Sequence, residues 1–310
     1  MTVARRFPTE HDPYPTRLDE PRAMIQRREP VLHGGVRAPG PLSRAELEQF
    51  GRDGFLVFEN FFPAGEMRPF LDEMRELSRD PKMLGRRRTI REPGCEEVRS
   101  IFAIHEISGR FHRLTREPRL LHMARQILDS DVYIHQSRIN YKPGFRGRGF
   151  NWHSDFETWH SEDGMPRMRA VSASILATDN FELNGPLMLI PGSHRYFVPC
   201  VGRTPRDNYR QSLRDQTLGV PDEGSLAELA RDGGVRAVKG APGTLILFEC
   251  NTLHASNANM SPYPRSNLFF VYNSVENRLL DPYCGSAPRP DFLGARANAR
   301  ALRGLRREAA

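Results

Sequence analysis

The chain has very few lysines and no concentrated block of positive charge. Of its 45 lysines and arginines only three are lysine, at positions 82, 142 and 239. The net charge of +7 could indicate a nucleic-acid-binding surface. The basic residues are spread along the chain, however, so we expect no nucleic-acid partner.

Cysteine and long apolar runs are scarce as well. The four cysteines form no CxxC pair, which argues against a zinc ribbon or a disulfide framework. No stretch approaches the ~20 apolar residues that a membrane helix needs. The first 22 residues contain no apolar core of a signal peptide. We therefore expect a cytoplasmic protein with no membrane partner.

The composition is that of a soluble globular protein, with 38% hydrophobic and 27% charged residues. Residues 1–41 are rich in proline, arginine and glycine and lack periodicity, which predicts an extended N-terminal arm. Residues 42–290 are expected to form a single domain. The arginine-rich residues 291–310 are expected to form a basic C-terminal tail.

Helical patterns precede strand patterns along the chain. A helix is expected to begin after an N-cap at Ser43 and to end at Gly51, and an amphipathic helix to span 118–131. Short alternating or apolar runs then predict strands, namely FLVF, DVYIHQSRINYK, MRAVSASILAT, PLMLIPGS, GTLILFEC and NLFFVYNSV. The polar insert 202–234 reads as a loop with short helices. This order predicts a mainly β fold with flanking helices, a β-sandwich or jelly roll.

The segment FNWHSDFETWH, residues 150–160, contains both tryptophans of the chain and two of its histidines. On an extended segment His153 and Asp155 point to the same side. Two histidines and one carboxylate on one face of a metal are typical of Fe(II) oxygenases. His254, just past the strand GTLILFEC, is the candidate second histidine. From spacing alone, other histidines stay open as alternatives: His105, His135, His160 and His194.

Two cations are candidates for holding an acidic co-substrate. Arg265 lies eleven residues after His254 and leads into the strand NLFFVYNS. Its guanidinium matches a carboxylate with two parallel hydrogen bonds. Lys142, in NYKPGF, is a lone lysine in an arginine-rich chain, which suggests that a compact charge is needed there.

The run IHQSRINYKPGF…FNWHSDFETWHSEDGMPRMRAVSASILATDNFELNGPLMLIPGSH, residues 134–194, closely resembles the ectoine hydroxylases of the phytanoyl-CoA dioxygenase family. The segments DPYPTR and GFLVFENFF look similar too. The resemblance covers about residues 12–285 and leaves out the arginine-rich tail. Arg148 and Asn151 depart from the pattern expected of that family, which affects fine substrate preference only.

The resemblance implies a double-stranded β-helix (jelly roll, cupin-like) that uses Fe(II), 2-oxoglutarate and O2. The implied reaction converts ectoine to 5-hydroxyectoine, a compatible solute of the stress response, and releases succinate and CO2. The implied iron ligands are His153, Asp155 and His254, and the implied 2-oxoglutarate contacts are Lys142 and Arg265. The implied ectoine contacts are Gln136, Trp159 and, more weakly, Asn140. The resemblance also implies a homodimer.

Without the resemblance, Trp159 reads as a core residue and Gln136 as an outward strand residue. Two other functions compete with ectoine hydroxylation. One is a dioxygenase of the same family that hydroxylates a different small molecule, such as an imino acid. The other is a non-catalytic protein that uses its arginines to bind nucleic acid, which predicts salt-sensitive binding and no turnover.

Overall fold

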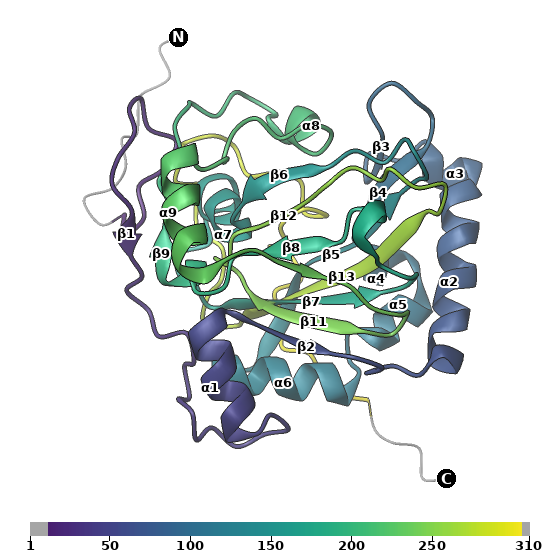
Figure 1. The fold of residues 1–310 in the computed structure, drawn as a ribbon, viewed down its shortest axis with the longest axis horizontal. Helices are drawn as coiled ribbons and strands as arrows, with labels where there is room; N and C mark the ends of the chain where they lie inside the picture. Colours follow the sequence, from purple (N-terminus) through teal and green to yellow (C-terminus); the bar gives the residue numbers. More distant parts are fainter. Residues whose placement is uncertain (1–11, 306–310) are drawn as a thin grey trace.

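The computed structural model describes residues 12–305 (Figure 1). Residues 1–11 of the expected arm and 306–310 of the expected tail lie outside the described residues. Two antiparallel sheets form the centre of the molecule, and helices pack against one of them (Figure 1).

The larger sheet has seven strands in the order β2-β11-β7-β13-β5-β4-β3. Their bounds are Phe55–Phe58 (β2), Leu245–Glu249 (β11), Ala170–Leu176 (β7), Arg265–Ser274 (β13), Val132–Lys142 (β5), Val98–Phe102 (β4) and Thr89–Arg91 (β3). The expected strands FLVF, DVYIHQSRINYK, MRAVSASILAT, GTLILFEC and NLFFVYNSV are all present in this sheet. β13 pairs with β5 on one side and with β7 on the other, so it lies at the middle of the sheet.

The smaller sheet has four strands in the order β10-β8-β12-β6. They are Arg236–Val238 (β10), Leu187–Leu189 (β8), His254–Ser256 (β12) and Phe150–His153 (β6). Apolar side chains of the two sheets pack together between them, including Leu176, Phe248 and Phe269 of the larger sheet with Leu187 and Leu189 of the smaller. Two facing antiparallel sheets form the expected jelly roll with flanking helices.

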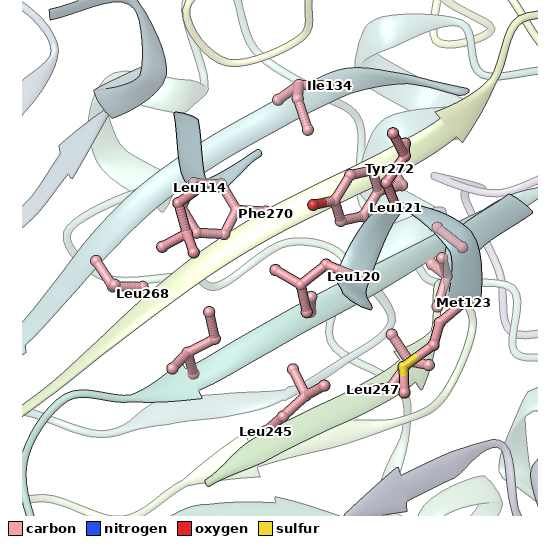
Figure 2. Close-up of a cluster of buried hydrophobic side chains, with 14 of the residues drawn as sticks. Leu114, Leu120, Leu121, Met123, Ile134, Leu245, Leu247, Leu268, Phe270 and Tyr272 are labelled. Atoms are coloured by element: carbon pink, nitrogen blue, oxygen red, sulfur yellow. The ribbon is translucent and has the colours of Figure 1, made fainter. Parts of the chain in front are cut away.

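Helices cover the other face of the larger sheet. They include Arg44–Asp53 (α1), Ala64–Arg79 (α2), Pro81–Leu84 (α3), Ile104–Ile107 (α4), Gly109–Leu114 (α5) and Pro118–Leu128 (α6). Alternate residues of β13, Leu268, Phe270 and Tyr272, join the side chains of α5 and α6 in one buried cluster (Figure 2). The residues of β13 that alternate with these three face the smaller sheet, because successive side chains of a strand point to opposite faces. Each buried leucine or phenylalanine contributes about 1.5–3 kcal/mol to this cluster.

The first helix ends later than the sequence predicts. Ser43 is its N-cap, as expected, but the helix continues through Gly51 to Asp53 and ends at Gly54. Gly54 has φ +82, the left-handed conformation that glycine adopts without strain. The expected end at Gly51 was therefore wrong, because the positive φ is needed three residues further on.

The remaining helices lie in the connections, and segments near both ends of the described chain form hydrogen bonds with strands. These helices are Asp155–Thr158 (α7), Trp159–Asp163 (η1, a π-helix), Glu182–Asn184 (η2), Ser193–Arg195 (η3), Tyr209–Ser212 (α8) and Glu223–Gly233 (α9). Near the N-terminus, Ile25–Gln26 (β1) pairs with Tyr196–Phe197 (β9). Near the C-terminus, Ala295 and Leu302 donate backbone hydrogen bonds to His135 and Val132 of β5. No helix within residues 12–305 is both long and apolar enough to cross a membrane.

Candidate metal and substrate site

Three potential metal ligands converge at one edge of the smaller sheet. His153 ends β6, His254 begins β12, and the antiparallel pairing of these strands places the two residues opposite each other. Asp155 follows two residues after His153, at the first position of α7. One ligand atom from each of the three side chains lies within 4.8 Å of the others. No other such group of histidine, cysteine or acidic residues occurs in the described part of the chain.

Backbone hydrogen bonds orient both imidazoles. Nδ1 of His153 lies 2.7 Å from the carbonyl oxygen of Asn151, and Nδ1 of His254 lies 2.9 Å from that of Thr252. A ring N–H that donates to a carbonyl leaves the lone pair on the other nitrogen, Nε2. The Nε2 atoms lie 3.9 Å and 3.8 Å from the two carboxylate oxygens of Asp155. The lone pairs therefore face the same space as the carboxylate.

The charge state of this group suits a divalent cation. Burial, and after it the neighbouring His254, lowers the pKa of His153 to about 4. Burial also lowers the pKa of His254, so both rings are neutral at pH 7. Burial alone would raise the pKa of Asp155, but His254 and Arg138 outweigh it and the pKa is lowered. Asp155 Oδ2 is buried without a hydrogen-bond partner. Two neutral imidazoles and one carboxylate are the donor set of a non-haem Fe(II) site, so these residues fit that metal.

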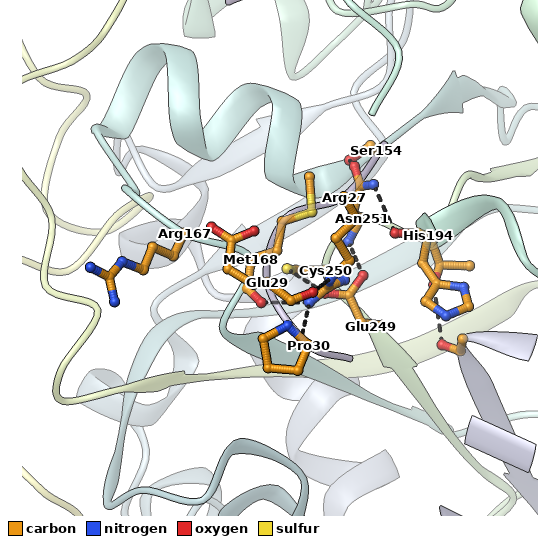
Figure 3. A network of polar contacts seen from close by, with 12 residues as sticks. Arg27, Glu29, Pro30, Ser154, Arg167, Met168, His194, Glu249, Cys250 and Asn251 are labelled. Carbon is orange, nitrogen blue, oxygen red and sulfur yellow. Dashed lines mark hydrogen bonds and ion pairs between the residues drawn. The ribbon is translucent and has the colours of Figure 1, made fainter. Parts of the chain in front are cut away.

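A buried polar network holds the segment that carries Asp155 (Figure 3). Ser154 Oγ donates to Asn251 Oδ1 at 2.8 Å, and the Asn251 backbone N–H donates to Glu249 Oε2 at 2.6 Å. Glu249 in turn forms an ion pair with Arg27, with 2.8 Å between Nη1 and Oε1. Ser154 precedes Asp155, and Asn251 lies three residues before His254. The network therefore ties the segments of two of the three potential ligands to each other and to the N-terminal part of the chain.

A first cavity beside the histidines has two buried cations next to it. Arg265 lines this cavity and is the register partner of Lys142 across β13 and β5. Lys142 Nζ donates to Ser256 Oγ, also in the cavity wall, at 2.8 Å and to the carbonyl oxygen of Asn257. Burial, and after it Arg265, lowers the pKa of Lys142 to about 6.

Arg265 is 2% exposed and its Nε has no hydrogen-bond partner. Burial lowers its pKa to about 10. Neither Arg265 nor Lys142 forms a salt bridge with any carboxylate of residues 12–305. A buried cation without a counter-ion is costly, so the cavity is suited to an acidic ligand.

A second cavity adjoins the first and contains the expected substrate contacts. Gln136, Asn140 and Trp159 all line it, together with His153 and Asp155. Gln136 Nε2 donates to the carbonyl oxygen of Leu293 at 2.6 Å. Trp159 is 2% exposed and packs edge-on against His135, with 4.9 Å between ring centroids. Asn140 lines both cavities, and its Oδ1 accepts from Ser100 Oγ at 2.8 Å.

β5 has an irregularity beside this cavity. Val271 of β13 pairs with Gln136, but the next residue, Tyr272, pairs with Ile134. His135 is therefore the extra residue of a β-bulge, which changes the direction of side chains along the strand. As a result His135 contacts Trp159 while Gln136 lines the cavity.

The other histidines have different partners. His105 Nδ1 lies 2.6 Å from Ser137 Oγ, and His194 Nε2 lies 3.3 Å from the carbonyl oxygen of Gly51. His135 Nε2 lies 3.5 Å from Asp163 Oδ2, and His160 Nε2 lies 2.9 Å from Asp12 Oδ1. The structure thus brings only His254, among the five candidates in the described chain, to the two residues His153 and Asp155.

Sequence reasoning missed three arginines of the second cavity: Arg17, Arg138 and Arg289. Arg138 lines both cavities and donates from Nη1 to Gln136 Oε1 at 2.7 Å. Alternation along β5 could have found Arg138, since residues 136, 138, 140 and 142 share one face of a strand. Nothing in the local sequence singles out Arg17 or Arg289, which approach from the two ends of the chain.

Comparison with known proteins identifies the relatives of this chain. The family model for phytanoyl-CoA dioxygenase (PhyH) matches residues 50–267. Ectoine dioxygenase of Halomonas elongata is 56% identical over 284 residues, which are 91% of this chain and 85% of that protein. Ectoine dioxygenase of Bordetella bronchiseptica is 52% identical over 294 residues, or 95% of this chain and 96% of that protein.

Solved structures agree with the sequence relatives. A crystal structure of EctD from S. alaskensis with 2-oxoglutarate and 5-hydroxyectoine has a TM-score of 0.85 to this structure and 46% sequence identity. The match covers 95% of this chain and 98% of that one. Since a family model matches most of the length and half of the positions agree with close relatives, the chain belongs to the phytanoyl-CoA dioxygenase family.

Proposed function

We propose that this protein hydroxylates ectoine to 5-hydroxyectoine, consuming 2-oxoglutarate and O2 and releasing succinate and CO2. One observation carries the proposal: the group His153, Asp155 and His254 opens onto two adjoining cavities. One has unpaired cations for an acidic co-substrate, and the other has polar and aromatic groups for a small zwitterion. The names of the curated relatives support ectoine as that zwitterion.

His153, Asp155 and His254 hold Fe(II) in this proposal. When bound, ferrous iron supplies the activation of O2 that amino-acid side chains cannot provide. The hydrogen bonds to Asn151 and Thr252 hold the two imidazoles with Nε2 toward the metal position. Because three protein groups of residues 12–305 converge there, a metal held by them would keep positions for 2-oxoglutarate and O2.

Arg265 and Lys142 bind 2-oxoglutarate. The guanidinium of Arg265 pairs with the carboxylate far from the metal, and Lys142 adds a second positive charge. A carboxylate beside Lys142 favours the charged ammonium and opposes the effect of burial on its pKa. Both cations come from neighbouring strands of the larger sheet, and the hydrogen bond from Lys142 to Ser256 links them to β12, the strand that begins with His254.

Gln136, Trp159 and Asn140 position ectoine in the second cavity. The indole of Trp159 stacks on the cationic ring of ectoine, which contributes about 0.5–2 kcal/mol depending on desolvation. Arg138 adds a guanidinium to the same cavity and can donate hydrogen bonds to the carboxylate of ectoine. Because Leu293 and Arg138 fix both ends of the Gln136 amide, its orientation is set before the substrate arrives.

The experiment that tests this function is an assay with Fe(II), 2-oxoglutarate and ectoine. We expect succinate and a product heavier than ectoine by one oxygen atom in equal amounts. An Asp155→Ala variant serves as the inactive control. Succinate production that depends on another small molecule, such as an imino acid, would keep the reaction class and refute ectoine as substrate. No succinate with any substrate would refute the reaction class.

We further propose that the enzyme is a cytoplasmic homodimer in which residues 42–290 form the catalytic domain. Four exposed apolar side chains support a self-association surface: Phe145, Leu183, Met260 and Tyr263. Backbone hydrogen bonds join their loops, from Phe145 to Ser261 and from Met260 to Leu183. Exposed apolar patches of this kind mark interaction surfaces. Light scattering of wild type and Met260→Asp tests the dimer, and a monomeric wild type would refute it.

A further inference from the structure

The segment from Asp155 to Asp163 carries both a potential iron ligand and the tryptophan of the substrate cavity. It begins as α7 and continues as the π-helix η1, which starts at Trp159. Single π-turns are frequent at functional sites. The segment also carries three buried carboxylates, Glu157, Glu162 and Asp163, none of which takes part in the metal site. The arginines that pair with them come from the segments before β1 and after β13.

The N-terminal partner is Arg17. Its Nε and Nη2 donate to the two carboxylate oxygens of Glu157 at 2.7 Å and 2.9 Å. Its Nη2 also lies 3.2 Å from Glu162 Oε1. Arg17 is 7% exposed and has φ +58, a backbone conformation that non-glycine residues adopt infrequently. The arginine is thus held by two acids, one on either side of Trp159 in the sequence.

The C-terminal partner is Arg289. Its Nε and Nη2 donate to the two carboxylate oxygens of Asp163 at 2.8 Å and 2.6 Å. Arg296 adds a hydrogen bond to the carbonyl oxygen of Asp163. Arg289 is 8% exposed. The end of η1 is therefore anchored to the segment that follows β13, while Glu157 of α7 and Glu162 of η1 are anchored to Arg17 near the N-terminus.

Both arginines line the second cavity with Trp159, and neither lines the first cavity, which contains Arg265. Their charges are already neutralised by bidentate carboxylates, so they are poor candidates for binding an anion themselves. Buried ion pairs add little net stability compared with apolar residues of similar size. Their contribution is geometric: planar bidentate contacts fix the position of the carboxylates, and with them the turn that carries Trp159.

We propose that Arg17 and Arg289 are positioning residues for substrate recognition, which hold the segment 155–163 between the two ends of the chain so that Trp159 is placed against the substrate. This inference rests on the proposed function for the identity of the substrate. It assigns no role to either arginine in binding 2-oxoglutarate.

The test compares Arg17→Lys and Arg289→Lys with wild type and with Arg203→Lys. Lysine keeps the charge but loses the bidentate contact. Arg203 is the matched control because it makes an equally bidentate contact, with Asp19, at the exposed surface. We expect KM for ectoine to rise by about ten- to a hundredfold in the two buried variants. KM for 2-oxoglutarate and the affinity for Co(II), measured by its absorption spectrum, should stay within a factor of about two of wild type.

A second measurement does not depend on turnover. In a Trp152→Phe background, Trp159 is the only tryptophan, and its emission reports its surroundings. We expect a shift to longer wavelength in Arg289→Lys and Arg17→Lys and no shift in Arg203→Lys. If ectoine is not the substrate, this emission shift still tests the positioning role, so the two proposals can fail separately.

A paired variant, Arg289→Met with Asp163→Leu, guards against simple loss of folding. Removing both partners avoids a buried unpaired charge, so this protein should fold with a raised KM for ectoine. An unchanged KM for ectoine and unchanged emission in all of these variants would overturn the proposal. An equal rise in KM for 2-oxoglutarate would also overturn it, since the arginines would then hold the whole site.

Discussion

At the scale of single residues, Arg265 is buried at 2% exposure, yet its Nε has no hydrogen-bond partner within residues 12–305. An unpaired buried cation destabilises the free protein, so we infer that Arg265 serves to bind a ligand and not to stabilise the fold. Lys142 is a related case: burial, and after it Arg265, lowers its pKa to about 6, so the amine is largely neutral at pH 7 until an acidic ligand favours its charged form. Burial of both basic side chains lowers the stability of the free protein at the cavity where we expect an acidic co-substrate.

Replacement of Arg265 by methionine should therefore separate binding from stability. We expect KM for 2-oxoglutarate to rise by about ten- to a hundredfold, because hydrogen bonds to charged groups contribute about 1.5–3 kcal/mol. In the absence of ligands, the free energy of unfolding should be unchanged or higher. Steady-state kinetics and urea denaturation measure the two effects, with the exposed Arg44→Met as control. A clear loss of stability without a change in KM would contradict this interpretation.

Asp155 provides the complementary case of an anion kept for a cation. Its Oδ2 is buried without a hydrogen-bond partner. Removing the carboxylate removes this unpaired oxygen, but the two histidines that remain are not enough to hold Fe(II). Asp155→Ala should lose metal binding and all activity while its fold persists. Titration with Fe(II) under anaerobic conditions, followed by thermal unfolding with and without metal, checks both statements. A metal-dependent rise in Tm equal to that of wild type would refute the role of Asp155.

The sequence predicted these residues to different degrees. The spacing of His153 and Asp155 suggested a metal site, but the choice of His254 over four other histidines depended on the family resemblance. Arg17 and Arg289 could not be found, because their partners are 140 and 126 positions away. In a chain with 45 basic residues, an individual arginine carries no local signal. Its role is set only when the fold brings distant segments together.

At the scale of elements, the end of α1 shows that a glycine in the sequence does not by itself determine where a helix ends. The sequence predicted the end of the helix at Gly51, and the structure uses Gly54. A Cβ at Gly54 would lie 2.4 Å from His194 Nδ1 and 2.7 Å from Thr252 Oγ1. At Gly51 the only neighbour within 4 Å would be Leu32 Cδ1, at 3.6 Å. The difference comes from contacts with β11–β12 and η3, which the local sequence does not contain.

These two glycines form a matched pair for substitution by alanine. Gly54→Ala should lower the free energy of unfolding by about 1–3 kcal/mol, because alanine is strained at positive φ and its Cβ collides with neighbours. Gly51→Ala should be neutral or stabilising by about 0.5–1 kcal/mol, because alanine favours helix. Chemical denaturation of both variants measures the difference. Equal effects would show that the end of α1 tolerates either residue.

Strand positions were easier to predict than strand partners. Alternation located β5 and an apolar run located β13, but no comparable sequence pattern indicates the bulge at His135 or the π-helix η1. Both irregularities lie beside the second cavity, which Gln136 and Trp159 line. Alternation in the sequence arises from burial of one face of a regular sheet. The bulge and the π-helix depart from regular hydrogen bonding, and this departure changes the direction of particular side chains.

At the scale of the whole molecule, buried histidines determine how stability responds to acid. Burial lowers the pKa of His105 to about 4 and that of His194 to about 3. Each is ~6.5 in the unfolded chain. Between these values the unfolded chain binds protons that the folded protein does not, so stability rises with pH and falls as the solution is acidified. The buried carboxylates Glu157 and Asp163 have lowered pKa values and add a further loss only at more acidic pH.

The metal-free protein should therefore lose on the order of a few kcal/mol of unfolding free energy between about pH 6.5 and 4. Urea denaturation at a series of pH values measures this loss. His105→Asn should flatten the slope in that range, because asparagine binds no proton, while its amide can still bond to Ser137 Oγ, the partner of His105 Nδ1. A slope in this variant as steep as in wild type would show that His105 does not contribute. Stability that increased on acidification would contradict the sign of the argument itself, since it would require the folded state to bind the additional protons.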